Sequence, residues 1–409
     1  MGLNQGGLLL AAIIACWTAC GSTAGADWVS CQNKPTRDCL LEEAFRGDSG
    51  PLTGKDRLEI MIAGGALTYP DWVTAADVAE AQRLAQSASQ LNNLNLYHAY
   101  IAIHGLVAAN QKQQAIDLVD SLSGTLQELS INELVRDLVK AGDLQTALAL
   151  PNQIQLPGDP SIRVGIIASA VKALAEIGKP DQALTLIADQ MYLPEAATAD
   201  MQAAVGLAYD KRGDAKLAQG IFDQAAKNLE AAQRHAVVAA RQHAMALPAL
   251  DTRLRFAVIR ILALRGEVDA VNAAVAQEQS SADAATSDSR TDYERNQGYQ
   301  IVVRALLDAR QPEAALRLAK SLTPDAAKEI ALSHVAFWDA ANDRLADARA
   351  VYSSMDKERE TARVFVVRNL AIFSTKAGDV ASALQFASEL KNPSNRRGML
   401  FAIAHMLPP

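Results

Sequence analysis

The sequence predicts an all-α protein built from repeated helical hairpins. Ala is the most frequent residue in the 409-residue chain, and aromatic residues make up only 5%. Ala is the strongest helix former, whereas a large sheet needs many Val, Ile, Thr and aromatic residues. Helix-breaking turns also recur along the chain, and the apolar residues before and after each turn follow helical spacing. These observations together indicate helices that come in pairs.

Composition narrows the class of protein further. Half of the residues are hydrophobic, 21% are charged, and the formal net charge is -7 at pH 7. A chain this apolar is not mainly disordered. The basic residues are scattered through an acidic chain with a pI near 5.5, which argues against binding to nucleic acid or to an anionic membrane surface.

The N-terminus has the pattern of an export signal. Residues 8–15 read LLLAAIIA, and Ala24-Gly25-Ala26 is a small-residue cleavage site. The apolar run is shorter than the roughly 20 residues that span a bilayer as a helix. We therefore expect a signal peptide over 1–26 and a mature periplasmic protein. One departure is that residues 1–7 contain no Lys or Arg, where a positive charge is usual.

Two alternatives to cleavage after residue 26 remain open. The segment Ile13-Ile14-Ala15-Cys16 resembles a bacterial lipobox, which would make Cys16 a lipid anchor on a membrane facing the periplasm. The N-terminus would otherwise stay attached as an uncleaved anchor. In each case the rest of the chain is exported.

Two cysteines follow the signal, and they predict a disulfide. Cys31 and Cys39 are the only cysteines outside the first 26 residues. In an oxidising compartment they would bond to each other, stabilising the protein by about 2 kcal/mol and pinning segment 27–52. A metal or redox pair is the alternative, but the C-x7-C spacing lacks companion ligands. Further helices are expected in segment 53–94, over 56–66 and 75–91.

The remainder of the chain repeats one turn. A helix-breaking polar pair is followed about five residues later by a small residue, and successive pairs are 32 to 36 residues apart except for two intervals of 53 and 44. This spacing is typical of stacked two-helix units with insertions at two joints. The pairs and their small residues are Asn110-Gln111 with Ala115, Gly142-Asp143 with Ala147, Gly178-Lys179 with Ala183, Gly213-Asp214 with Ala218, Gly266-Glu267 with Ala270, Arg310-Gln311 with Ala315, Asp343-Arg344 with Ala348, and Gly378-Asp379 with Ala383.

Three segments depart from the repeat. The Ala-rich residues 228–247 predict an added or lengthened helix before Pro248. Residues 279–292, QSSADAATSDSRTD, are polar enough to predict a loop. Residues 394–406 predict a single helix that caps the last hairpin.

The repeat resembles the tetratricopeptide repeat, a helical hairpin of 34 residues. The best unit, residues 199–232, carries the family's consensus positions, and the resemblance covers roughly residues 95–409. It implies a right-handed α-solenoid of about eight or nine hairpins that binds proteins or peptides. The consensus residues are Gly206, Tyr209, Gly213, Asp214, Ala218, Phe222 and Ala225.

The resemblance also implies where a partner would bind. In this family the first helix of each hairpin lines the concave face, so polar positions on those helices are candidates. Neither charge sign dominates among them, which favours a mixed-charge or apolar peptide over a polyanion. Charged residues on a helix more often form a solvated surface that binds no partner. The candidates are Lys172, Glu176, Asp210, Lys211, Arg368 and Lys376.

Catalytic and metal-binding motifs are weak. Residues 47–52 read GDSGPL, like the nucleophile loop of trypsin-like proteases, but the chain lacks the β-barrel and the flanked His that Ser49 would need. No two of the six His residues have the i, i+4 spacing that would place them together on one helix face. We therefore expect no catalytic residue, no metal ligand and no cofactor.

The sequence as a whole predicts a non-catalytic scaffold of the bacterial cell envelope. It would recognise a protein or peptide through the concave face of the solenoid. One alternative is a lipid-anchored adaptor for cell-wall or outer-membrane assembly enzymes. A second, less favoured, is a cell-wall hydrolase carried on a helical solenoid.

Overall fold

The described part of the chain is entirely helical, apart from its turns and connections. A computed structural model describes residues 31, 34–46, 51–88, 91–154, 160–190, 192–243, 248–284, 289–323, 325–356 and 360–408. The expected signal peptide over 1–26, its alternative anchor Cys16, and Ser49 lie outside these residues. No helix in the described ranges is both long and apolar enough to cross a membrane.

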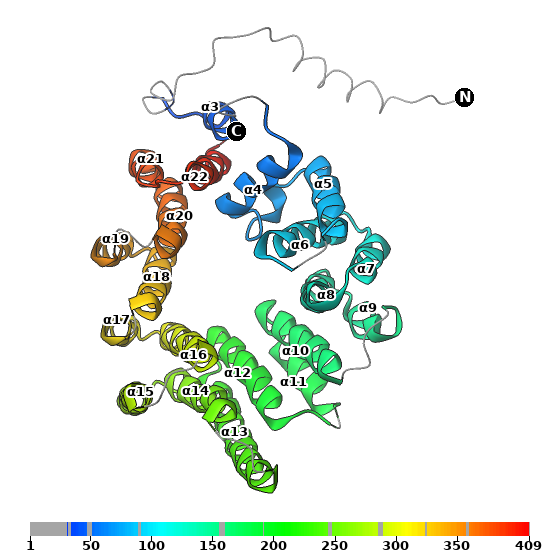
Figure 1. Ribbon diagram of the computed structural model, residues 1–409, viewed down its shortest axis with the longest axis vertical. Coiled ribbons are helices and arrows are strands. Elements are labelled where there is room, and N and C mark those ends of the chain that lie inside the picture. The colour runs from blue at the N-terminus through cyan, green and yellow to red at the C-terminus, as the bar shows by residue number, and fades with distance from the viewer. Residues whose placement is uncertain are drawn as a thin grey trace.

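The helices alternate between two positions. They are α3 (Arg37–Ala44), α4 (Gly54–Gly64), η1 (Pro70–Trp72), α5 (Ala75–Gln86), α6 (Asn93–Ala108), α7 (Lys112–Ser121), α8 (Gly124–Lys140), α9 (Leu144–Ala149), η2 (Leu150–Asn152), α10 (Pro160–Glu176), α11 (Pro180–Ala188), α12 (Glu195–Arg212), α13 (Ala215–His243), α14 (Pro248–Leu264), α15 (Val268–Ala284), α16 (Ser289–Asp308), α17 (Pro312–Ser321), α18 (Asp325–Ala341), α19 (Leu345–Ser354), α20 (Glu360–Lys376), α21 (Val380–Ser388) and α22 (Pro393–Met406). Each even-numbered helix packs against the next even-numbered one, from α4 through to α22. Odd-numbered helices such as α7, α15, α17 and α19 lie outside them (Figure 1).

The predicted repeat turn forms at all eight positions. The first residue of each pair has a left-handed backbone, with φ from 57° at Arg310 to 90° at Gly213. The amide of the second residue then donates to the carbonyl five residues earlier, as from Asp143 to Leu138 at 2.8 Å. This hydrogen bond is the Schellman closure of a helix C-terminus. The turns therefore end one helix and begin the next, as the sequence predicts.

One small residue in that pattern was assigned wrongly. Ala115, Ala147 and their equivalents are buried, but Ala270 is exposed. Val271 is fully buried in its place. In the other units the buried residue stands five positions after the left-handed residue of the turn. Five positions after the left-handed Gly266 is Val271, not Ala270.

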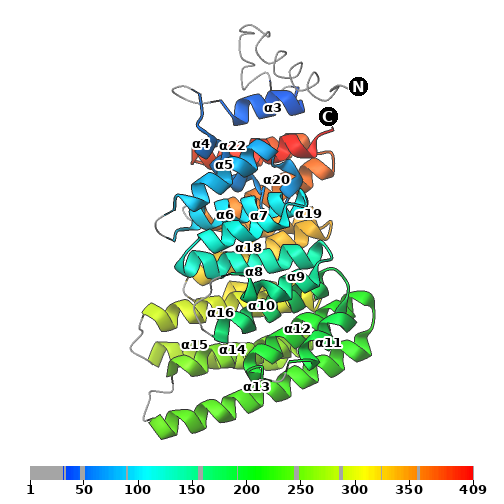
Figure 2. The same cartoon turned by 90° about the vertical axis from the view of Figure 1, so that its right-hand side faces the viewer.

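The two ends of the described chain pack together. Helix α22 contacts both α3 and α4, so the row of even-numbered helices closes into a ring (Figure 1). Figure 2 shows α3 lying over α22 and α4 at one end of the molecule. The ring of Phe401 on α22 is buried and lies 5.7 Å from that of Phe45 and 5.8 Å from that of Trp72, centroid to centroid. Aromatic contacts therefore join residues that are more than 300 positions apart.

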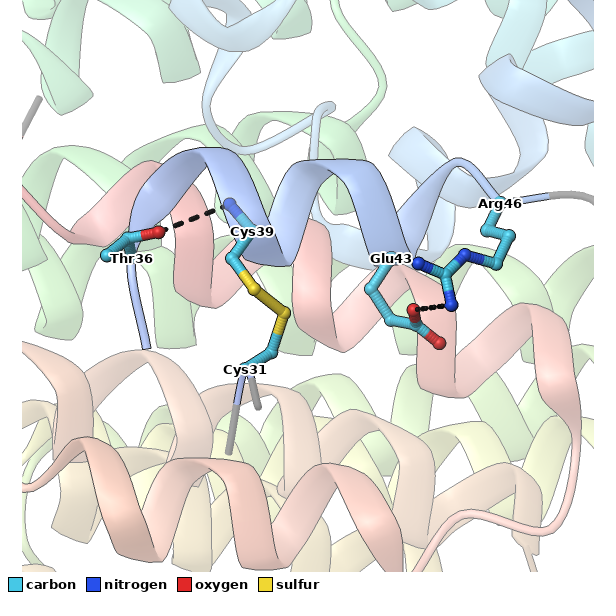
Figure 3. The surroundings of a disulfide bond; sticks show 5 residues. All are labelled: Cys31, Thr36, Cys39, Glu43 and Arg46. Atoms are coloured by element: carbon cyan, nitrogen blue, oxygen red, sulfur yellow. Dashed lines mark hydrogen bonds and ion pairs between the residues drawn. A yellow bond between two sulfur atoms is a disulfide. The ribbon is translucent and has the colours of Figure 1, made fainter. Parts of the chain in front are cut away.

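The predicted disulfide between Cys31 and Cys39 is present. Their Cα atoms are 5.8 Å apart, within the usual range for a disulfide. Cys39 lies in the first turn of α3, where the Thr36 hydroxyl accepts a hydrogen bond from its backbone amide, as Figure 3 shows. Since α3 packs on α22, the bond ties the start of the described chain to the ring closure.

Two of the segments that depart from the repeat are now defined, and one differs from expectation. Residues 228–243 lengthen α13, and the helix expected over 394–406 is α22. The loop expected over 279–292 is mostly helical, because residues 279–284 end α15 and 289–292 begin α16. Hydrogen bonds of its polar side chains explain why this polar segment is helical. The Gln279 side chain donates to the backbone carbonyl of Ser321, and the Ser280 hydroxyl donates to the backbone carbonyl of Ala276.

Candidate functional site on the inner surface

The even-numbered helices keep one stripe of side chains accessible. On α6, Tyr97, Tyr100 and His104 are half-buried, while most residues on the other faces are fully buried. The spacing of three or four residues places them on one helix face. Odd-numbered helices cover the outer face, so this stripe faces the inside of the ring. We call the equivalent partly exposed residues of α6 to α20 the inner surface.

Charges on the first half of the inner surface are paired with each other. The Lys172 ammonium lies 2.6 Å from Asp200 on the next inner helix, and Arg260 on α14 contacts the same carboxylate. Although burial alone would raise the pKa of Asp200, these two cations hold it below its usual value. Lys172, one of the six residues predicted to bind a partner, therefore links neighbouring helices instead.

Glu176 joins a second network of the same kind. Its carboxylate lies 3.2 Å from Arg136 and 3.0 Å from Lys140, both on α8. The two cations lower the pKa of Glu176 against the effect of burial. A partner would have to break these pairs to use the same charges, so this part of the inner surface offers few free groups.

Sequence reasoning missed a cluster of three metal-ligating side chains. Nδ1 of His104 contacts Asp137, its Nε2 lies 3.4 Å from Oε1 of Glu133, and a potential ligand atom from each residue lies within 4.8 Å of the others. Glu133 and Asp137 are four residues apart on α8, and His104 faces them from α6. The sequence has no two histidines on one helix face, and it does not display that a histidine of one helix lies opposite two carboxylates of another. Only the packing of α6 on α8 brings the three together.

The second half of the inner surface is aromatic and cationic. The ring of Phe337 on α18 is 5.7 Å from Phe365 and 6.3 Å from Phe373 on α20, centroid to centroid. We call Phe337, Phe365 and Phe373 the aromatic patch. Phe337 keeps 38% of its surface exposed despite these contacts.

Arg368 and Lys376 border this patch. The Arg368 guanidinium lies 5.3 Å from the centre of the Phe365 ring, and the Lys376 ammonium lies 5.3 Å from that of Phe373 and 5.7 Å from that of Tyr69. Burial lowers the pKa of Arg368, while the nearby Tyr69 and Tyr97 act in the opposite direction. Within the described ranges, neither cation has a carboxylate at ion-pair distance. Lys172 and Glu176, in contrast, each form an ion pair with a neighbouring helix.

The remaining two residues that were predicted to bind a partner lie at the C-terminal end of α12. Asp210 is half-buried and Lys211 is exposed, just before the turn at Gly213. The structure therefore places all six predicted residues on even-numbered helices, but only Arg368 and Lys376 lie beside exposed aromatic surface.

Comparison with known proteins finds no family model that matches the chain and no similar curated protein.

Proposed function

We propose that the protein is an exported, non-catalytic scaffold of the bacterial cell envelope. It binds a protein or peptide partner along the inner surface of a tetratricopeptide-like, right-handed α-solenoid of eight or nine hairpins. The repeat spacing and the eight left-handed turns support this architecture. The Cys31–Cys39 disulfide supports an oxidising compartment such as the periplasm.

The observation that carries the proposal is the exposed apolar surface on two adjacent inner helices. Ile301 on α16 is 42% exposed, and Ile330 and Phe337 on α18 are 37% and 38% exposed. Aromatic side chains and Arg are enriched at the centres of protein interfaces, and exposed apolar patches rimmed by polar groups mark such sites. Arg368 and Lys376 supply that rim, so we expect a partner segment that presents apolar side chains together with acidic groups.

Photo-crosslinking in the producing cells tests this proposal. A benzoylphenylalanine at position 337 samples the inner surface, and one at position 238 samples α13, where Val238 is 51% exposed. We expect a defined protein adduct from position 337 and none of the same mass from position 238. Equal adducts from both positions, or none from position 337, would contradict binding at the inner surface.

A second candidate is an adaptor held to a membrane by a lipid on Cys16. The lipobox-like sequence before Cys16 favours it, and the partners would then be cell-wall or outer-membrane assembly enzymes. Lipid labelling that is lost in Cys16→Ser would support this form. A mature N-terminus at Asp27 would instead support soluble export.

A further inference from the structure

The ion network around His104 contains more carboxylates than permanent cations. Glu133, Asp137 and Glu176 are its carboxylates, whereas Arg136 and Lys140 are its cations. The three side chains of the cluster are 15%, 13% and 11% exposed for His104, Glu133 and Asp137. Carboxylates that are mostly withdrawn from water need a compensating cation.

The spacing of the cluster suits a bound metal ion. Nε2 of His104 and Oε1 of Glu133 are 3.4 Å apart, too far for a good hydrogen bond. Two ligands of a tetrahedral zinc ion, each about 2.1 Å from the metal, lie roughly 3.3 to 3.4 Å from each other. The separation therefore matches two ligand atoms on either side of one ion.

The neighbouring contacts are those of an outer coordination shell. Arg136 donates to Oε2 of Glu133 at 3.1 Å, so its sister oxygen Oε1 remains turned toward the ring. A metal-bound imidazole uses one nitrogen and gives its other N–H to a carboxylate, which fixes the ring orientation. His104 has a carboxylate at each nitrogen, so it can bind through one nitrogen and donate from the other.

We propose that Nε2 of His104 and Oε1 of Glu133 bind a Zn²⁺ ion that joins α6 to α8, while Asp137 accepts the hydrogen bond from Nδ1 and holds the ring in place. An imidazole and a carboxylate suit this ion, and the remaining coordination positions are left to water at the inner surface. The site does not depend on the proposed scaffold function, because zinc binding and partner binding are measured separately.

Zinc titration of residues 27–409 tests the site. The protein is prepared without an affinity tag, stripped with EDTA and titrated with ZnCl₂ by calorimetry in the presence of millimolar Mg²⁺. We expect one equivalent to bind, and we expect His104→Gln and Asp137→Asn each to weaken binding by about tenfold or more. The matched control is His235→Gln, since His235 also contacts a carboxylate, Glu195 at 3.0 Å, but belongs to no cluster of three such groups in the described ranges. It should leave the affinity unchanged.

A second measurement avoids dependence on the variants. Co²⁺ added to the stripped wild-type protein should give the intense visible absorption of a low-coordinate site, which stoichiometric Zn²⁺ should abolish. No stoichiometric binding by wild type would overturn the proposal. So would zinc affinity that His104→Gln leaves unchanged, or that His235→Gln reduces as much. In those cases the contacts of His104 with Glu133 and Asp137 are an ion network without a metal.

Discussion

Gly64 and Gly398 are in backbone contact where α4 crosses α22. A methyl group placed on Gly64 would lie 2.6 Å from the carbonyl oxygen of Gly398, and one placed on Gly398 would lie 2.7 Å from the backbone nitrogen of Gly64. Neither clash involves a flexible side chain that could move aside. The absence of both side chains is therefore what lets the first and last inner helices approach and close the ring.

A larger residue at this crossing should open the ring. We expect Gly398→Val to destabilise the closure by about 1 to 3 kcal/mol or more, because overpacked contacts force the backbones apart. Hydrogen exchange should then increase in α3, α4 and α22, and small-angle scattering should give a larger radius of gyration. The control is Gly220→Ala on α13, where an added methyl group meets no atom within 4 Å. That change should stabilise the helix slightly, and unchanged closure in Gly398→Val would contradict the account.

The turn at Arg310 should improve when it is replaced by glycine. Arg310 is exposed and has φ of 57°, a conformation that costs a residue with a side chain about 1 kcal/mol. We expect Arg310→Gly to raise the free energy of unfolding by about 0.5 to 1 kcal/mol in denaturant titrations. Arg317→Gly, at an exposed position inside α17, should lower it by about 1 kcal/mol. Destabilisation by both substitutions would argue against the left-handed turn.

The disulfide should stabilise the closure more than the middle of the chain. We expect Cys31→Ser with Cys39→Ser to cost about 2 kcal/mol, because the unfolded chain regains the freedom of a short loop. Faster hydrogen exchange should be confined to α3 and the face of α22 on which it packs. A uniform loss of protection through α8 to α14 would contradict this localisation.

Acidification should destabilise the protein through His334. Burial lowers the pKa of His334 to about 4 from an ordinary value of 6.5, and the charge of Arg304 acts in the same direction. Between those two values the unfolded chain takes up a proton that the folded protein does not. The unfolding free energy should therefore fall as the pH drops from 6.5 toward 4, by at most about 1.4 kcal/mol per pH unit for this group.

The substitution His334→Gln isolates this contribution. Burial also lowers the pKa of His98 and His405, so the wild-type slope contains more than one histidine. The variant should show a shallower loss of stability between pH 6.5 and 5 in thermal unfolding. An NMR titration that gives His334 a pKa near 6.5 in the folded protein would contradict the argument.

The repeat turns were predictable because their cause is local. A left-handed residue at Gly142 or Gly378 ends a helix through contacts within six residues, and the sequence displays it directly. The same locality explains the one wrong small residue, since counting five positions from Gly266 would have selected Val271. The disulfide was predictable because only two cysteines follow the N-terminal segment.

The ring closure and the state of the candidate site were not predictable in the same way. Gly64 and Gly398 carry no periodic signal that relates them, and their meeting depends on the summed rotation of every hairpin between them. The six candidate residues were placed on inner helices by the repeat, but their ion partners come from neighbouring units. Lys172 is neutralised by Asp200 and Arg368 is not matched by any described carboxylate, a difference that only tertiary packing creates.

Affinity capture from the organism's own envelope fraction tests the central claim most directly. Residues 27–409 serve as bait with mild cross-linking, and captured proteins are identified and quantified by mass spectrometry. Phe337→Glu alters the aromatic patch at a position that is already 38% exposed, and Val238→Glu makes the same change on α13 at a position that is 51% exposed. We expect a near-stoichiometric protein partner that Phe337→Glu removes and Val238→Glu retains. Capture of no protein, or a partner retained equally by both variants, would contradict a scaffold that binds through its inner surface.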